Sequence, residues 1–138
     1  MKTLAIAATF AVASLLAMPA ADARTKLTGE QQLSKMLEGR EAGKPVSCIP
    51  TSMTQNSTVI DKTAIVYKVG STLYVNRPIN ADRLDDDDLM VTRLYSSQLC
   101  RLDTVQLHDR YGSYMWNGFV GLRDFVPYKK VKTVASAN

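Results

Sequence analysis

Two patterns of hydrophobic and polar positions follow one another along the chain. From Leu33 onward, apolar side chains recur at the i, i+3 and i+4 spacing that is typical of one face of a helix. Thr28 followed three residues later by Gln31 is a capping-box pattern, which marks the start of a helix. The spacing predicts one N-terminal helix over about residues 28–38, ended by Gly39.

From about residue 46 to residue 126 the pattern changes to short β-branched and aromatic runs separated by turn residues. The predicted strands cover residues 46–49, 59–60, 64–69, 72–76, 89–95, 102–111 and 114–122. Gly70-Ser71 and Gly112-Ser113 match two-residue turns with glycine first, and each predicts a hairpin. In the first hairpin Tyr67 should face Tyr74, and apolar groups on both faces predict a sheet that is covered on both sides.

These elements predict one small domain over residues 24–128. Its fold class is mainly β (small α+β), with an antiparallel sheet, sandwich or small barrel built from hairpins, one N-terminal helix and one disulfide. Residues 40–45 lack apolar periodicity and are predicted to form a linker. Pro127 favours an edge strand or a strand end, and residues 129–138 are predicted to form a disordered basic tail.

The first 23 residues differ from the rest. Lys2 precedes an uncharged apolar run over 4–18, and Ala21-Asp22-Ala23 matches the small-x-small pattern of signal peptidase sites. This predicts a signal peptide over 1–23, cleaved after Ala23. The apolar run is shorter than the about 20 residues that cross a bilayer, so we expect no transmembrane segment after cleavage. The predicted location is the periplasm, with an extracellular location as the alternative.

Composition limits the classes of protein that remain. The chain has 138 residues, of which 46% are hydrophobic and 22% charged, with a formal net charge of +4. These values suit one globular core and exclude disordered, collagen-like and polytopic membrane proteins. Part of the positive charge lies in the tail, so no nucleic-acid partner is predicted.

The interpretation of the two cysteines, Cys48 and Cys100, depends on the predicted export of the protein. In an oxidising compartment an even count of two predicts one bridge between them. No C-x-x-C motif is present, so the bridge is interpreted as structural and not redox-active.

Asp103 is the candidate buried polar site, together with Arg101. Strand alternation places Asp103 in phase with Val105 and Leu107 on the apolar side, where a carboxylate needs partners. It can be half of an acid/base or ligand site, with Arg101 or Arg93 as counter-ion. Alternatively, it has a structural role, in which it caps backbone N–H groups beside the disulfide or pairs with an arginine.

His108 is the single histidine of the chain. It shares phase with Gln106, away from Asp103, so it is expected to be exposed and not to meet that carboxylate. One histidine and two paired cysteines cannot form a zinc site of usual composition, and common hydrolase and nucleotide-binding motifs are missing. We therefore assign no catalytic residue, metal or cofactor, and whether the protein is an enzyme stays open.

An acidic run and a set of aromatic residues each allow more than one interpretation. The acidic run Asp85 to Asp88 lacks the spacing of a calcium-binding loop and is predicted to be a solvated turn. Several aromatic residues can line a groove for a glycan or peptide, or they can be half-buried sheet cover. They are Tyr67, Tyr74, Tyr111, Tyr114 and Trp116.

Several short motifs together resemble a known family. They lie at 37–40, 44–49, 74–78, 99–103 and 125–128 and include Leu-Cys-Arg-Leu-Asp and Phe-Val-Pro-Tyr. The chain is similar to a domain-of-unknown-function family of short exported proteins of alphaproteobacteria, especially sphingomonads. The resemblance implies a periplasmic location and a disulfide between the two motif cysteines, and it brings no activity.

Two functions are compatible with these observations. The first is a non-enzymatic periplasmic ligand- or partner-binding module, since disulfide-stapled β domains without clustered catalytic side chains suit such a role. The alternative is a small periplasmic hydrolase or lyase that uses Asp103 and His108. The oligomeric state has no signature in the sequence.

Overall fold

The computed structural model describes residues 26–53, 56–112 and 114–132. The predicted signal peptide and its cleavage after Ala23 lie outside the described residues, as does the predicted tail from residue 133 onward. No helix among the described residues is long and apolar enough to cross a membrane.

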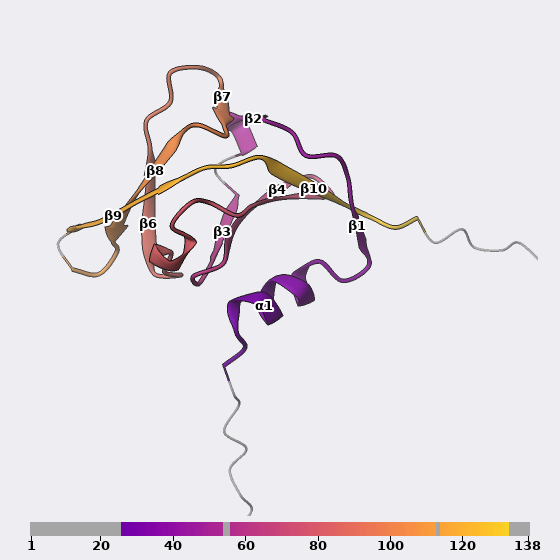
Figure 1. Cartoon of the computed structure of the whole chain (residues 1–138), viewed down its shortest axis with the longest axis horizontal. Helices are drawn as coiled ribbons and strands as arrows, with labels where there is room; N and C mark the ends of the chain where they lie inside the picture. The colour runs from indigo at the N-terminus through magenta and orange to yellow at the C-terminus, as the bar shows by residue number, and fades with distance from the viewer. Residues whose placement is uncertain (1–25, 54–55, 113, 133–138) are drawn as a thin grey trace, which may run out of the picture.

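The described chain folds into one α-helix and three antiparallel sheets (Figure 1). The largest sheet has the order β1-β10-β5-β4-β3, with bounds Arg40–Ala42, Phe125–Lys130, Thr72–Asn76, Ala64–Val69 and Ser57–Ile60. A three-stranded sheet has the order β6-β8-β9, with bounds Asp88–Thr92, Thr104–Asp109 and Trp116–Gly121. A two-stranded ribbon pairs β2 with β7, with bounds Cys48–Pro50 and Gln98–Cys100. This confirms the mainly β, antiparallel fold class, and no closed barrel forms within the described residues.

Helix α1 (Gly29–Met36) begins where the capping box predicts it. The Thr28 hydroxyl accepts a hydrogen bond from the Gln31 backbone N–H, and the Gln31 side-chain oxygen accepts one from the Thr28 N–H. Two otherwise unpaired N–H groups of the first turn are thereby satisfied. The helix ends at Met36, slightly earlier than predicted.

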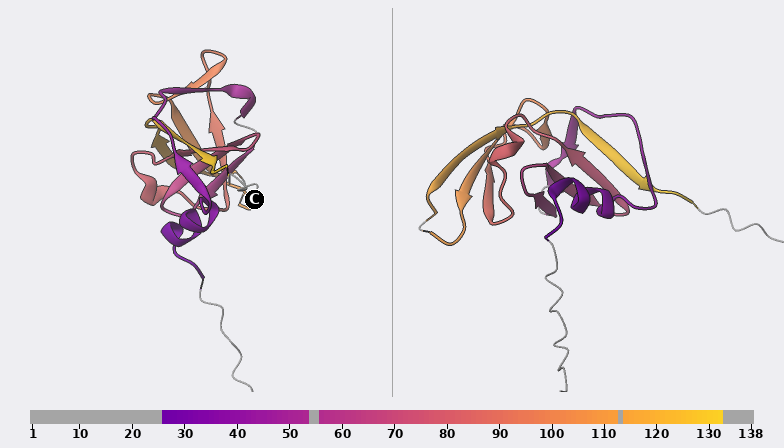
Figure 2. Two further views of the ribbon diagram at one scale, coloured as in Figure 1. Left: turned by 90° about the vertical axis from the view of Figure 1, so that its right-hand side faces the viewer. Right: turned by 60° about the horizontal axis from the view of Figure 1, so that its bottom comes forward.

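The five-stranded sheet is covered on both faces, as its alternating pattern predicts. On one face, Leu33 of α1 packs in a cluster with Ala64 and Val66 of β4. On the other face, Ile65 and Tyr67 of β4 join a larger core that includes side chains of the three-stranded sheet and the ribbon. Figure 2 (right) shows α1 below the five-stranded sheet and the three-stranded sheet to its left.

The β4–β5 hairpin has the predicted register. Tyr67 faces Tyr74, and Val69 faces Thr72 across the turn. Gly70 has a φ of +56°, a conformation that glycine adopts without steric cost. The prediction is confirmed because a two-residue turn fixes every later cross-strand pair.

The predicted linker over residues 40–45 is partly wrong. Arg40–Ala42 form β1, which pairs with residues 128–130 of β10, so Lys129 and Lys130 belong to a strand and not to the tail. The Arg40 guanidinium also donates to the backbone carbonyl of Ser71. A polar edge strand shows no alternation of apolar and polar side chains, because backbone hydrogen bonds to a strand distant in sequence hold it in place.

Pro127 lies in an inner strand and not at an edge, because β10 sits between β1 and β5. Its carbonyl accepts a hydrogen bond of 2.7 Å from the Gly43 N–H, so its nitrogen also faces the β1 side. Gly43 lies just beyond the end of β1. The missing N–H of proline therefore falls where regular pairing with β1 has already ended.

The β8–β9 hairpin forms, but its predicted two-residue turn is wrong. The Asp109 N–H donates to the Met115 carbonyl, and β9 begins only at Trp116. The register also shifts within the pair: Leu107 faces Gly118 whereas His108 faces Trp116, which leaves Asn117 as the extra residue of a β-bulge. The longer loop and the bulge absorb residues that the pattern assigns to strands.

Candidate functional site

The disulfide between Cys48 and Cys100 is formed, as predicted. The two residues face one another in the antiparallel pairing of β2 with β7. Between them the two strands contribute Ile49 and Leu99, each 1% exposed, to the larger core. The bridge therefore fixes a short ribbon that closes one end of the core, which is a structural role.

Asp103 lies beside this bridge, and its carboxylate caps the backbone N–H of Cys100. One carboxylate oxygen of Asp103 accepts a hydrogen bond of 2.6 Å from the Cys100 backbone N–H. The side chain is half-buried, less than the predicted burial. The predicted counter-ion Arg101 instead lies 3.7 Å from the Asp124 carboxylate, and no ion pair of Asp103 occurs in the part of the chain that is described. The geometry matches the capping alternative.

His108 and Asp103 do not form a pair. Val105 and Leu107 are fully buried, whereas Gln106 is exposed, so β8 keeps the predicted alternation. Asp103 precedes β8 and lines a hollow together with Thr104 and Gln106, so the predicted inward position of its side chain is wrong. Five residues along an extended chain separate Asp103 from His108 by about 16 Å. His108 is half-buried and not exposed, and its Nδ1 lies 3.1 Å from the Tyr114 carbonyl oxygen. The arrangement assembles no acid/base pair from these residues.

Substitution of the two residues should separate their roles. Asp103→Ala is expected to lower the free energy of unfolding by about 1–3 kcal/mol, because the Cys100 N–H loses its acceptor. His108→Ala should lower it by less than about 1 kcal/mol. Urea unfolding measures both values. Asp103→Asn keeps an acceptor oxygen and should recover most of the loss, and equal effects of all three variants would contradict the capping role.

The acidic run is only partly the predicted solvated turn. Residues 85–87 are exposed, but Asp88 is 4% exposed and begins β6. One oxygen of Asp88 accepts a hydrogen bond of 3.0 Å from the Asn117 side chain, whereas Oδ2 is buried without a partner among the described residues. The bulge in β9 supplies Asn117, and no local pattern around Asp88 signals it.

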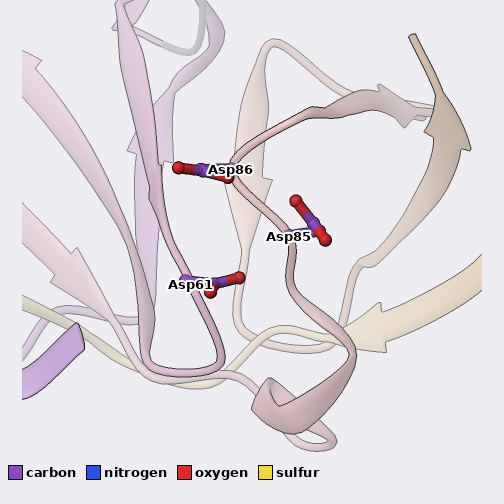
Figure 3. A group of neighbouring side chains, drawn as sticks. All are labelled: Asp61, Asp85 and Asp86. Carbon is purple, nitrogen blue, oxygen red and sulfur yellow. The ribbon is translucent and has the colours of Figure 1, made fainter. Parts of the chain in front are cut away.

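Two aspartates of this run lie close to a third aspartate from another part of the chain (Figure 3). Carboxylate oxygens of Asp61, Asp85 and Asp86 lie within 4.8 Å of one another. Asp61 lies in the turn between β3 and β4, so the sequence pattern could not place it here. Carboxylates near a protein surface gather in this way without an ion as well, and the cluster is no evidence of a metal site by itself.

The outer face of the three-stranded sheet is mostly apolar and open. Cross-strand pairs place Leu89, His108 and Trp116 in one row, and Val91, Gln106 and Phe119 in the next. A hollow of about 330 Å³ continues this face at its far end. We call this surface the platform, and it consists of Leu89, Val91, Arg93, Tyr95, Leu102, Asp103, Thr104, Gln106, His108, Trp116 and Phe119.

A second open feature lies between two sheets, along β3 and β6. One hollow of about 500 Å³ is lined by α1, β3 and the start of β6, and an adjoining hollow of about 160 Å³ is lined by the rest of β6. Ser57 and Met90 line both hollows. We call the two hollows together the edge groove. Tyr67 closes its inner side, and burial raises the pKa of this phenol, which keeps it neutral.

The aromatic residues proposed from sequence fall into two groups. Tyr67 is core, with its ring 5.8 Å from that of Phe125, and Tyr74 is half-buried. Tyr111, Tyr114 and Trp116 are more than 60% exposed, at or beside the platform. The sequence pattern did not identify the platform residues Leu89, Val91 and Phe119 as a site. Leu89 and Val91 do alternate along β6 as outward-facing strand residues should.

Comparisons of the chain with family models, curated proteins and solved structures give no match. The functional argument therefore depends on the geometry alone.

Proposed function

We propose that the protein is a non-enzymatic exported module that binds a protein partner through the platform. The observation that carries this proposal is the exposure of six large apolar side chains, four on the outer face of the three-stranded sheet and two, Tyr95 and Leu102, in the hollow that continues it. Their exposed fractions range from 39% for Leu89 to 88% for Tyr95. Contiguous apolar patches of this kind mark interaction sites on soluble proteins.

The composition around the platform supports a protein partner. The platform contains no lysine and no glutamate, and it includes Arg93, Tyr95 and Trp116. Protein interfaces are depleted in lysine and glutamate and enriched in aromatic residues, methionine and arginine. The platform has this composition.

The size of the platform is adequate for a specific complex. Its six apolar side chains expose on the order of 700 Å², given about 150–250 Å² for each whole aromatic side chain. Each partner in a standard interface buries roughly 800 Å². The adjacent loop adds Tyr111, Tyr114 and Met115, all more than 60% exposed.

The charges of the platform define the chemistry of the partner. Arg93 is exposed and has no ion pair within the described residues. The Asp103 carboxylate lines the same hollow as Arg93 and already accepts from the Cys100 N–H. The other polar members, Thr104, Gln106 and His108, offer hydrogen bonds without a fixed charge. The partner surface should therefore be apolar, with polar groups at its rim that meet Arg93 and Asp103.

Export to the periplasm is part of the same proposal. The formed disulfide is compatible with an oxidising compartment, and the pattern of residues 1–23 is typical of a cleaved signal peptide.

Site-specific photo-crosslinking tests the platform. A photoreactive phenylalanine at position 119 should cross-link one dominant envelope protein, whereas the same group at the exposed Lys68 position of β4 should not. The identified protein is then purified and its affinity measured directly. Trp116→Ser and Phe119→Ser should each weaken binding at least tenfold, since buried aromatic anchors dominate interface energy.

The matched control is Val131→Ser. Val131 is 47% exposed, close to the 49% of Phe119, but lies outside the platform. It should change the affinity less than twofold. The proposal fails if the purified partner binds the platform variants as tightly as the unchanged protein, or if no protein cross-links at position 119.

A further inference from the structure

The edge groove is bounded by two strands that are both at the end of a sheet. β3 is the last strand of the five-stranded sheet and β6 the first of the three-stranded sheet. Each therefore has a hydrogen-bonded neighbour on one side only, within the part of the chain that is described. The N–H and C=O groups on the other side of an edge strand are available to a further strand.

The two strands run in opposite directions along the groove. In the larger hollow residues 57–59 of β3 accompany residues 86–90, whereas in the smaller hollow Ser57 accompanies residues 90–94. Advancing along β6 thus means moving back along β3. A strand placed between them would be parallel to one and antiparallel to the other, as in a mixed sheet.

The edges of β3 and β6 are only partly protected against a further strand, since the one charged residue in the two strands is the buried Asp88. β3 and β6 contain no proline and no lysine, and β6 is rich in β-favouring side chains. An extended peptide is the ligand that matches two such edges, because it offers N–H and C=O groups at the same spacing on both of its sides. A small rigid molecule cannot satisfy both rows at once.

The two ends of the groove differ in chemistry. The larger hollow includes the carboxylates of Asp86 and Asp88 against one guanidinium, that of Arg110, and the exposed Asp85 and Asp87 lie next to them in sequence. The Oδ2 atom of Asp88 is a buried acceptor without a partner among the described residues. A buried acceptor is stabilised by a donor, and the excess of carboxylates favours a cationic one.

The smaller hollow is mainly apolar. Its walls include Tyr67, Met90, Leu94 and Leu99, and its volume of about 160 Å³ suits one aliphatic side chain. Side chains of an extended peptide point to the same side at every second position. A basic and an aliphatic side chain two or four positions apart would therefore reach the two hollows together.

We propose that the edge groove binds an extended peptide segment by strand addition between β3 and β6, with a basic side chain in the larger hollow, which Asp86 and Asp88 line, and an aliphatic side chain in the smaller hollow. This goes beyond the proposed function, because the groove and the platform are lined by largely different residues. The ligand class is an unfolded or terminal segment of another polypeptide.

A phage-displayed library of linear eight-residue peptides provides the probe. Panning on the full mature protein should enrich peptides with lysine or arginine two or four positions from valine, isoleucine or leucine. Backbone N-methylation of an enriched peptide at alternate positions should weaken binding at least tenfold, because strand addition depends on its N–H groups. Amide chemical shifts should change mainly in β3 and β6.

Two pairs of matched variants locate the binding site. Asp86→Lys should weaken binding of the enriched peptide about tenfold, whereas Asp82→Lys, the same charge change at an exposed site outside the groove, should alter it less than threefold. Ser57→Trp fills the point where the hollows adjoin and should reduce binding at least tenfold. Ser71→Trp in the exposed β4–β5 turn is its control.

Thermal unfolding of each variant verifies that it folds. Loss of peptide binding in folded Asp86→Lys and Ser57→Trp, with both controls intact, supports the proposal. It is overturned if panning enriches no peptide, if N-methylation has no effect, or if the shift changes map to the platform. Platform variants such as Phe119→Ser should leave peptide binding unchanged, so the failure of either proposal is distinguishable from that of the other.

Discussion

Removal of the Cys48–Cys100 disulfide is expected to lower the free energy of unfolding by about 2–5 kcal/mol. The bridge joins residues 52 positions apart, and closing a loop of that length restricts the unfolded chain by about 4 kcal/mol in the chain-entropy description. The folded state also loses stability, because β2 and β7 have three residues each and a ribbon that short is not stable alone. Ile49 and Leu99 would then no longer be held in the core.

Urea unfolding of the Cys48→Ala/Cys100→Ala protein, compared with the oxidised protein, measures this loss. Reduction of the unchanged protein should give a similar value, and Ser47→Ala, an exposed neighbour in sequence, should change stability by less than about 0.5 kcal/mol. An unchanged urea midpoint on reduction would show that the ribbon is held by packing alone.

Asn76→Ala is expected to cost about 2–4 kcal/mol of stability. Asn76 is fully buried at the end of β5, and its side-chain amide donates to the Arg123 carbonyl and accepts from the Arg123 N–H. Arg123 lies in the connection where the chain passes from β9 to β10. Truncation to alanine leaves both backbone groups without their partner and opens a cavity.

Asn76→Asp separates the loss of the hydrogen bonds from the opening of a cavity, because it keeps the shape of the side chain. Only the protonated carboxyl can both donate to the Arg123 carbonyl and accept from the Arg123 N–H. Burial raises the pKa of a carboxyl above its unfolded value of about 3.9, so its stabilising contribution is present below that pH and lost as pH rises. We therefore expect a larger loss at pH 7 than at pH 4, each relative to the unchanged protein.

Asn56→Ala provides the control, since Asn56 is exposed and should change stability by less than about 0.5 kcal/mol. Equilibrium unfolding at the two pH values decides the outcome. An Asn76→Asp protein that is equally stable at both would contradict the role of the amide as a two-bond clamp.

Local signals in the sequence determined a substantial part of this fold. The Thr28–Gln31 capping box fixed the start of α1, and the turn after Val69 fixed the β4–β5 register. Alternation along β8 was also sufficient to place Val105 and Leu107 in the core and Gln106 outside it. These features depend on groups within a few residues of one another, where backbone geometry leaves few choices.

Contacts between distant segments determined the rest. The pairing of β1 with β10 recruited polar residues that carry no strand pattern, and it made Pro127 part of an inner strand. Asp88 is buried within a run that otherwise is exposed, and Asn117, the extra residue of the bulge, donates a hydrogen bond to its carboxylate. A hydrogen bond between backbones leaves no trace in side-chain periodicity, so a sequence pattern cannot predict which distant strands pair.

The candidate sites followed the same division. The sequence indicated the disulfide and the outward phase of the strand residues around His108, because both depend on residue type and alternation. Only the tertiary structure gathered Leu89, Trp116 and Phe119 into the platform, since their strands are adjacent through cross-strand pairing. The edge groove was likewise decided by tertiary structure, because it exists only where two sheets leave the edges of β3 and β6 unpaired.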